Sequence, residues 1–258
     1  MPHSTDNFYR ARILERREIS DNLWVIRADP SGDFNFVAGQ YATVGVQTPE
    51  GHFERPYSIV SAPHEPLLEF FFELVPQGHL TPRLYAFRPG DEFTIRKKAK
   101  GRLTFDSDSG HKNHLLIATV TGVAPYVSYT RSFYKDWKDK KFGGEHRLFL
   151  LDGASRSREL GYREELERIA AEVPWLTYVP TVSRPWEDST WKGETGRVDD
   201  LIRKYADQWN LTPESATAYL CGNPGMIENV TGILQRRGWN EKAIRREAFF
   251  KDAPGHQA

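Results

Sequence analysis

The first hundred residues alternate apolar and polar positions in short segments, a pattern typical of β-strands. The apolar positions are rich in β-branched and aromatic residues, and clusters of Gly, Pro and Asp separate several of the segments. The pattern predicts one helix over 80–87 and six strands, at 9–19, 23–28, 41–46, 55–61, 68–75 and 92–96. Six short strands at this spacing favour a small closed antiparallel barrel.

The pattern changes after Leu103. A polar segment ending in Gly110 predicts a linker, and beyond it apolar runs alternate with segments of helical period. The five strands predicted there are 115–120, 148–151, 176–182, 217–221 and 244–250. Such alternation predicts a doubly wound parallel sheet with ligands at the carboxyl ends of its strands. We therefore expect a two-domain β plus α/β fold, with a six-stranded barrel in residues 1–104 and a five-stranded parallel sheet in residues 111–258.

Composition narrows the function classes. The 258 residues carry 35 acidic and 35 basic side chains, so no overall field recruits nucleic acid. The single cysteine, Cys221, excludes a disulfide framework and a cluster held by four thiolates, and the eight histidines show no metal-ligand spacing. Because no apolar run reaches the roughly 18 residues of a membrane span and no signal peptide is visible, we expect a cytoplasmic protein that does not bind membranes. Nothing in the sequence demands more than a monomer, and we expect that state.

The segment Arg55-Pro56-Tyr57-Ser58 combines a fixed cation, an aromatic ring and a hydroxyl on one predicted strand. The guanidinium suits a phosphate, the tyrosine ring suits a flat heterocycle, and the serine is a short-range donor. A nucleotide with a flat ring at one end would use this set. A surface strand whose arginine meets a carboxylate explains the same residues.

A second candidate segment begins at Gly78, just before the predicted helix. Glycine lets the backbone approach a ligand closely, and the free N–H groups of a first helical turn attract an anion. Thr81 and Pro82 are suitable residues for that turn. We expect Gly78, Leu80 and Thr81 to contact a phosphate mainly through backbone atoms, with an ordinary capped helix as the alternative.

Two Ser-Arg pairs follow neighbouring strands of the second half, so both are expected at its ligand edge. Ser155-Arg156 and Ser183-Arg184 each place a hydroxyl beside a guanidinium, which suits a phosphomonoester. Surface arginines without a ligand are the alternative interpretation. Asp152 points the other way, because an acid that closes this strand in an ordinary Rossmann fold favours the ribose diol of NAD.

Two more segments lie at the same predicted edge. Thr121, Gly122 and Pro125 open the helix after strand 115–120, where a dinucleotide phosphate rests on the helix dipole. Cys221 ends strand 217–221 and begins the sequence Cys-Gly-Asn-Pro-Gly-Met. A structural turn and a small buried hydrophobic residue are the respective alternatives.

Taken together, these segments resemble the bacterial branch of the FAD-containing ferredoxin–NADP reductase family. Segment 55–63 is similar to the family's flavin-binding strand, 78–84 to its turn over the flavin pyrophosphate, and 221–226 to its Cys-Gly-x-Pro-x-Met segment. Glu-Ala-Phe-Phe at 247–250 resembles the family's C-terminal Ala-Phe segment. One position departs from the pattern, because Val120 stands where the family usually has glycine and cannot allow the same close backbone approach.

The resemblance implies FAD and NADP(H) as cofactors, with the two Ser-Arg pairs around the 2′-phosphate. It implies that Ser58, Cys221 and Ala248 lie at the catalytic centre. The residues it assigns to cofactor binding are Arg55, Pro56, Tyr57, Ser58, Gly78, Leu80, Thr81, Thr121, Gly122, Pro125, Ser155, Arg156, Ser183, Arg184 and Phe249.

The implied activity is electron transfer through FAD between NADPH and a one-electron carrier, a ferredoxin or a flavodoxin. An acidic carrier is expected to dock on basic side chains near the flavin edge, which are Arg10, Arg12, Arg16, Arg17, Arg96, Lys97, Lys98, Lys100 and Arg102. The alternatives are an NAD(P)H-dependent reductase component of an oxygenase system and a non-catalytic flavin-binding regulatory subunit. Val120 favours the latter.

Overall fold

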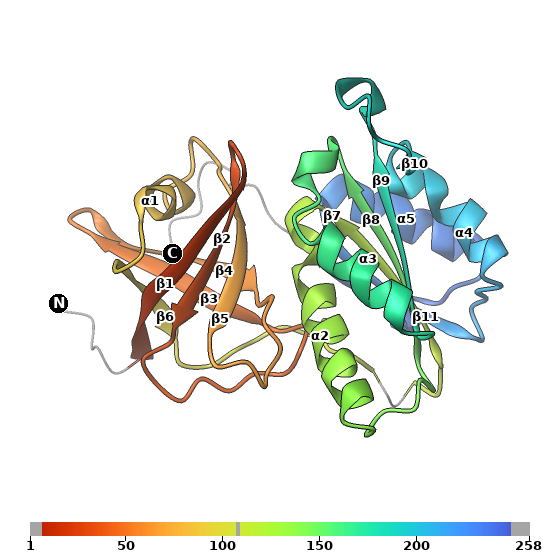
Figure 1. Ribbon diagram of the computed structural model, residues 1–258, viewed down its shortest axis with the longest axis horizontal. Coiled ribbons are helices and arrows are strands. Elements are labelled where there is room, and N and C mark those ends of the chain that lie inside the picture. The colour runs from red at the N-terminus through yellow and green to blue at the C-terminus, as the bar shows by residue number, and fades with distance from the viewer. Residues whose placement is uncertain (1–6, 107–108, 249–258) are drawn as a thin grey trace.

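The computed structural model describes residues 7–106 and 109–248 and contains two separate sheets (Figure 1). The N-terminal sheet is antiparallel with the order β4-β3-β6-β1-β2-β5. Its strands are β1 (Phe8–Ser20), β2 (Leu23–Asp29), β3 (Tyr41–Thr48), β4 (Gly51–Ser58), β5 (Leu68–Glu73) and β6 (Glu92–Arg96). The six predicted strands are confirmed. β4 begins at Gly51 instead of residue 55, because it forms a tight hairpin with β3.

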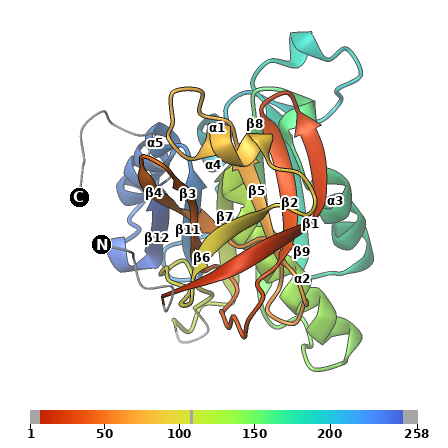
Figure 2. The ribbon, with the colours of Figure 1, turned by 90° about the vertical axis from the view of Figure 1, so that its left-hand side faces the viewer.

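The antiparallel sheet curls until its two edges meet. Ile59, directly after β4, forms an antiparallel bridge with Phe70 of β5, and the Val60 N–H donates to the Glu69 carbonyl at 2.9 Å. The helix α1 (Thr81–Ala86) lies over one end of this barrel (Figure 2). Apolar side chains fill the interior, among them Ala11, Ile13, Trp24, Ile26, Val44, Phe70, Phe72, Leu84 and Ile95.

The C-terminal sheet is parallel throughout, in the order β10-β9-β8-β7-β11-β12. Its strands are β7 (Asn113–Thr119), β8 (Arg147–Ala154), β9 (Leu176–Val182), β10 (Glu194–Thr195), β11 (Ala216–Gly222) and β12 (Ile244–Ala248). The predicted parallel sheet is confirmed, and the structure adds β10 at its edge. Two residues are too few to show a hydrophobic period, so the sequence pattern could not predict this strand.

Helices cover both faces of the parallel sheet (Figure 1). One apolar cluster joins the sheet to α2 (Ala124–Lys138) and α3 (Arg163–Glu172), and another joins it to α4 (Ile202–Gln208) and α5 (Pro224–Arg236). The strand order reverses between β7 and β11, which makes their carboxyl ends the point where ligands bind in such sheets. Within the described ranges, no helix has the length and apolarity needed to cross a membrane.

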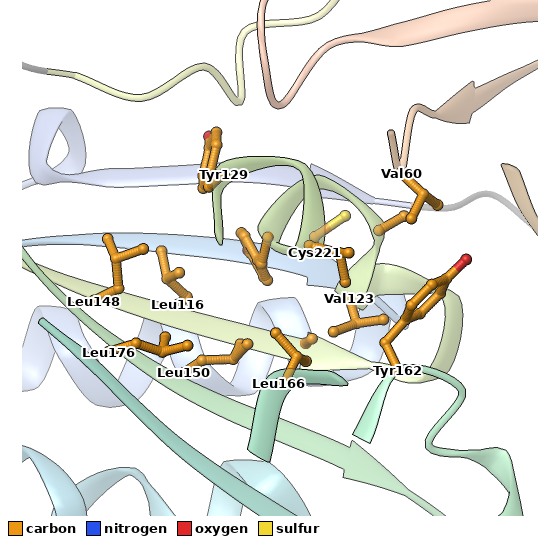
Figure 3. Packing of buried hydrophobic residues seen from close by; sticks show 14 of the residues in the cluster. Val60, Leu116, Val123, Tyr129, Leu148, Leu150, Tyr162, Leu166, Leu176 and Cys221 are labelled. Carbon is orange, nitrogen blue, oxygen red and sulfur yellow. The ribbon is translucent and has the colours of Figure 1, made fainter. Parts of the chain in front are cut away.

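One apolar cluster continues from the parallel sheet into the barrel (Figure 3). Val60 and Phe71 of the barrel belong to it, and the Phe71 ring meets Tyr162 edge-on with centroids 5.5 Å apart. A hydrogen bond from Ser128 Oγ of α2 to the Ser61 carbonyl, at 2.7 Å, crosses the same boundary. The two halves therefore share a continuous core.

An ion cluster centred on Arg131 of α2 also joins the two halves. The guanidinium donates to Glu69 of β5 at 3.0 Å and to Glu165 of α3 at 2.7 Å, and it approaches Glu65 at 3.3 Å. The Tyr162 hydroxyl donates to Glu69 at 2.7 Å. The Glu69 side chain is 7% exposed, and a charge so buried is stable only with partners of this kind. The cluster therefore fixes α2 and α3 against the barrel.

Two histidines, the buried His114 and the half-buried His146, lie beneath the segment that joins the two sheets. His114 of β7 is fully buried, with its Nε2 atom 3.0 Å from Nδ1 of His146 and its ring 4.3 Å from the Phe105 ring. The Tyr219 hydroxyl is 3.4 Å from His114 Nδ1. Burial, followed by repulsion from His146, lowers the pKa of His114 from 6.5 to about 3. His114 therefore stays neutral in the folded chain.

We expect His114 to make folding stability depend on pH. Below pH 6.5 the unfolded chain binds a proton at this side chain, whereas the folded chain excludes the proton until about pH 3. The contribution of His114 to the free energy of unfolding is therefore complete above pH 6.5 and is lost as the pH falls from 6.5 towards 3. Between pH 7.5 and pH 5 the loss is about 2 kcal/mol. Urea unfolding of His114→Phe and the parent at both pH values isolates this contribution. His64→Gln, at an exposed position, is the control, and equal pH dependence of His114→Phe and parent would contradict the assignment.

Candidate functional site

A cleft of about 650 Å³ opens between the barrel and the carboxyl ends of the parallel strands. Most of the predicted site residues line it, and they come from both halves of the chain: Arg55, Pro56, Tyr57, Ser58, Gly78, Leu80, Thr81, Thr121, Ser155, Ser183 and Ala248. The structure places Gly122, Pro125, Arg156, Arg184 and Cys221 behind or beside these walls, not among the lining residues. Phe249 lies outside the described residues.

The barrel wall of the cleft is formed by the end of β4 and by β5. The Tyr57 ring packs edge-on against Phe72 of the barrel core, with centroids 4.6 Å apart, so its orientation is fixed from below. Ser58 is buried, and Arg55 donates to the Glu54 carbonyl at 2.7 Å while lining the cleft. This wall presents an aromatic ring, a hydroxyl and a cation in sequence.

The turn that precedes α1 closes one end of the barrel wall. The Gly78 N–H donates to the Val75 carbonyl at 2.8 Å, and the Thr81 hydroxyl accepts from the Val75 N–H at 2.9 Å. The Thr81 side chain is thus used to shape the turn. None of the side chains that the structure describes caps the N-terminus of α1, so contacts to a ligand here would come from the backbone.

Glu247, a carboxylate to which the sequence pattern assigned no role, lies beside the cleft, next to its lining residues Ser58 and Ala248. Ser58 Oγ donates to Oε1 of Glu247 at 3.3 Å, which joins the end of β4 to β12. Burial raises the pKa of Glu247 to about 7, so this group exchanges a proton near neutral pH. Its position in the segment Glu-Ala-Phe-Phe was the available signal, but the pairing with Ser58 spans 189 residues and leaves no trace in local pattern.

Cys221 belongs to the apolar cluster that packs behind the cleft (Figure 3). Its side chain is fully buried at the end of β11, and burial, with a further contribution from Glu247, raises the pKa of the thiol well above its usual value. The thiol is therefore protonated at neutral pH. Gly222 and Ala248, which pair between β11 and β12, separate it from the lumen of the cleft.

The loops after β7 and β11 interlock through glycine. A Cβ atom on Gly122 would lie 2.2 Å from the Cys221 carbonyl oxygen, and one on Gly222 would lie 2.2 Å from Thr119 Oγ1. The same threonine hydroxyl accepts from the Asn223 N–H at 2.8 Å. Gly122 is thus required for contact between two loops and does not itself face the cleft.

Val120 is strained. Its φ of 49° lies in the left-handed region, where a β-branched side chain is a genuine outlier. The side chain lines the cleft and packs against Ala154, Leu160 and Val182. The position that the resemblance associates with glycine has therefore kept the glycine conformation while gaining a branched side chain.

The two Ser-Arg pairs lie side by side. The Ser183 N–H donates to the Ala154 carbonyl and the Arg184 N–H to the Ser155 carbonyl, both at 3.0 Å. Asp152, in contrast, does not line the cleft: it is buried, accepts from the Tyr178 hydroxyl at 2.9 Å, and burial raises its pKa to about 7. The expectation that an acid here would favour a ribose diol is therefore wrong, because the carboxyl group faces the core.

The comparisons with known proteins agree with this architecture. The family described as "Oxidoreductase NAD-binding domain" matches residues 116–232. Ferredoxin–NADP reductase A of Sorangium cellulosum is 31% identical over 242 residues, which are 89% of this chain and 83% of that protein. The phenol hydroxylase P5 protein of Acinetobacter pittii is 28% identical over 249 residues, which are 96% of this chain and 67% of that protein.

The fold is also found in solved structures. A ferredoxin–NADP reductase of Neisseria gonorrhoeae, determined with bound FAD and NADP, superposes with a TM-score of 0.80 at 24% identity, covering 95% of this chain and 99% of that one. The family match and the Sorangium relative define the class of protein as a nucleotide-dependent oxidoreductase. With the match to the Sorangium protein, the chain belongs to the ferredoxin–NADP reductase family.

We expect the strain at Val120 to reverse the usual order of alanine and glycine. A left-handed conformation costs a non-glycine residue about 1–2 kcal/mol, which exceeds the entropic disadvantage of glycine of roughly 0.5–1 kcal/mol. Val120→Gly should therefore be more stable to urea than Val120→Ala. At Val123, with a φ of −69°, glycine should be the less stable of the two. The same order at both positions would show that Val120 is not strained.

Proposed function

We propose that this chain takes a hydride from NADPH onto bound FAD and passes the electrons singly to a separate carrier protein. The proposal is supported by one observation: Tyr57 and Ser58 of the barrel face the strand-end loops of the parallel sheet across one cleft. The Ser58–Glu247 hydrogen bond joins the two walls. We further propose that residues 1–104 form the FAD-binding domain and residues 111–258 the NADP(H)-binding domain.

The residues of the barrel wall fit FAD. Tyr57 offers an aromatic face, Ser58 a hydroxyl and Arg55 a cation for a phosphate, while the turn at Gly78 offers backbone N–H groups near α1. Bound FAD would accept two electrons as a hydride at N5 from nicotinamide C4 and return them one at a time. No histidine or cysteine lies among the described residues lining the cleft, so we propose that the flavin is held noncovalently.

The protein's own part is to orient the reactants, exclude water and manage a proton. Ser58 and Glu247 stand where the two walls meet, and a carboxyl group with a pKa near 7 can hold or release a proton there. Ala248 lines the cleft beside them, and the Cys221 thiol supports the wall from behind. On the other wall, Thr121, Ser155 and Ser183 offer hydroxyls to the pyridine nucleotide.

A second candidate function is favoured by similarity to electron-transfer components of oxygenase systems. The similarity to a phenol hydroxylase component supports an NAD(P)H-dependent reductase that serves an oxygenase, whose acceptor would be a separate iron–sulfur protein. The two functions share the cleft and the flavin chemistry. They differ in the protein that accepts the electrons.

We expect the purified chain to hold one FAD and to be bleached by NADPH in the absence of oxygen. Arg55→Ala should weaken FAD binding about ten- to a hundredfold, since a charge-assisted hydrogen bond is worth roughly 1.5–3 kcal/mol. Arg96→Ala is the matched control, because that guanidinium pairs with Glu54 at 2.7 Å and does not line the cleft. Flavin fluorescence measures the affinity. A protein that stays yellow with both NADPH and NADH would be a non-catalytic flavin-binding subunit.

We propose that the carrier is acidic and docks beside the cleft on Lys98, Lys100 and Arg102, which are exposed. Gly101 lies between them and close to Glu247: a Cβ atom added to this glycine would lie 3.3 Å from Oε2 of the Glu247 carboxylate. The prediction that Arg16 belongs to the same docking surface is wrong. Its side chain is only 4% exposed, and it donates to the Phe87 carbonyl at 3.1 Å and stacks on Trp24.

Lys100→Glu should slow reduction of an acidic ferredoxin or flavodoxin about tenfold at low ionic strength, because steering of a charged partner depends on the local field. The difference should shrink as salt is added, while flavin bleaching by NADPH stays at the parental rate. Lys140→Glu is the control, since it follows the far end of α2, roughly 20 Å from the end that lines the cleft. Carrier reduction that is indifferent to ionic strength and to Lys100→Glu would remove this docking surface.

A further inference from the structure

The carboxylate of Glu187 contacts the guanidinium groups of both arginines in the Ser-Arg pairs. Glu187 Oε2 accepts from Arg156 Nε at 2.5 Å, and Glu187 Oε1 lies 3.5 Å from Arg184 Nη1. A second acid, Glu159, accepts from Arg156 Nη1 at 3.1 Å. Within the described residues, the serines of these pairs line the cleft and their arginines do not.

The loop that carries Glu187 is held in place. Glu187 ends a short 3₁₀ turn, Pro185–Glu187, and its N–H donates to the Arg184 carbonyl at 3.1 Å. The next residue, Asp188, accepts from the Ser157 hydroxyl and from the Thr190 hydroxyl. The approach of Glu187 to both guanidinium groups is thus built into the fold of 183–191.

The charges of the pocket balance before any ligand enters. Arg156 and Arg184 supply two positive charges, and Glu159 and Glu187 supply two negative charges. The hydrogen bond from Arg156 lowers the pKa of Glu187, which keeps it ionised at neutral pH. A phosphomonoester is a dianion that usually binds guanidinium groups, but a phosphomonoester bound at the serines would find both guanidinium groups already engaged by the Glu187 carboxylate. A carboxylate presents its oxygen atoms to a guanidinium much as a phosphate does.

We infer that Glu187 is an internal competitor for the 2′-phosphate of the pyridine nucleotide: it holds Arg156 and Arg184 until a phosphorylated nucleotide displaces it. The inference rests on the proposed use of NADP(H). Because the ordinary ribose diol of NAD needs neither arginine, Glu187 weakens binding of the phosphorylated nucleotide alone. Glu187 is therefore a residue that limits selectivity between NADPH and NADH.

The test is equilibrium binding of two fragments, adenosine 2′,5′-bisphosphate and AMP, measured by titration calorimetry on the flavin-loaded protein. Glu187→Gln keeps the shape of the side chain and removes its charge. We expect it to bind the bisphosphate about three- to tenfold more tightly than the parent, the size of a partly exposed charge interaction, and to bind AMP unchanged.

Two further variants make the result specific. Asp188→Asn removes the same charge from the same loop, but its amide can still accept from one of the two hydroxyls and donate to the other. The loop therefore keeps its position, and both affinities should stay at parental values. Arg184→Ala placed on Glu187→Gln should cancel most of the gain for the bisphosphate. Thermal unfolding confirms that each variant is folded.

The inference is overturned if Glu187→Gln binds the bisphosphate with parental affinity, or if it gains equally for AMP, which would show a general charge effect. Either result leaves the proposed function intact when NADPH still bleaches the flavin. A parent that neither NADPH nor NADH bleaches would instead refute the proposed function, whatever the fragments show. The two failures are therefore distinguishable.

Discussion

The position of the cleft depends on the Arg131–Glu69 ion pair and the apolar contact around it. Both charges are largely buried, and each has a second partner, Glu165 for the arginine and Tyr162 for the glutamate. Ion pairs of this kind contribute less to stability than to geometry, since loss of one partner strands a buried charge at a cost of about 3–5 kcal/mol. A rotation of the barrel on the parallel sheet would break the pair, which therefore restricts, together with the apolar contact around it, how the two walls of the cleft lie relative to each other.

Within the cleft, backbone and side chains have different tasks. The interlocked turns at Gly122 and Gly222 leave no room for a Cβ atom on either, and they fix where β7 and β11 present their ends. Chemistry is then added by a few side chains from distant parts of the chain, of which Ser58 and Glu247 form the link across the site. The two glycines thus determine the shape of the cleft, whereas its chemistry depends on side chains that come together only when the chain folds.

The sequence predicted most of the fold because its periodicities are local. It failed where a residue's surroundings come from elsewhere. Arg16 counted as part of a charged strand face, but a bulge between Ile13 and Glu15 turns it onto Trp24, at the end of α1. Asp152 follows an apolar run and gives no sign in sequence that its carboxyl group faces the core. The serine and arginine motifs were visible, but not the acid that neutralises them, because a loop position has no period from which its contacts can be read.

Cys221 gives the chain a simple chemical property. It is the one cysteine of the sequence, it is fully buried, and its thiol stays protonated at neutral pH. Alkylating agents and oxidants attack the thiolate, so the folded molecule presents them with no target at its surface. The sulfur lies at the end of β11 beside Ser58 and Glu247, and a reagent reaches it only when the structure around it opens. The rate of thiol labelling therefore measures how often the structure around Cys221 opens locally.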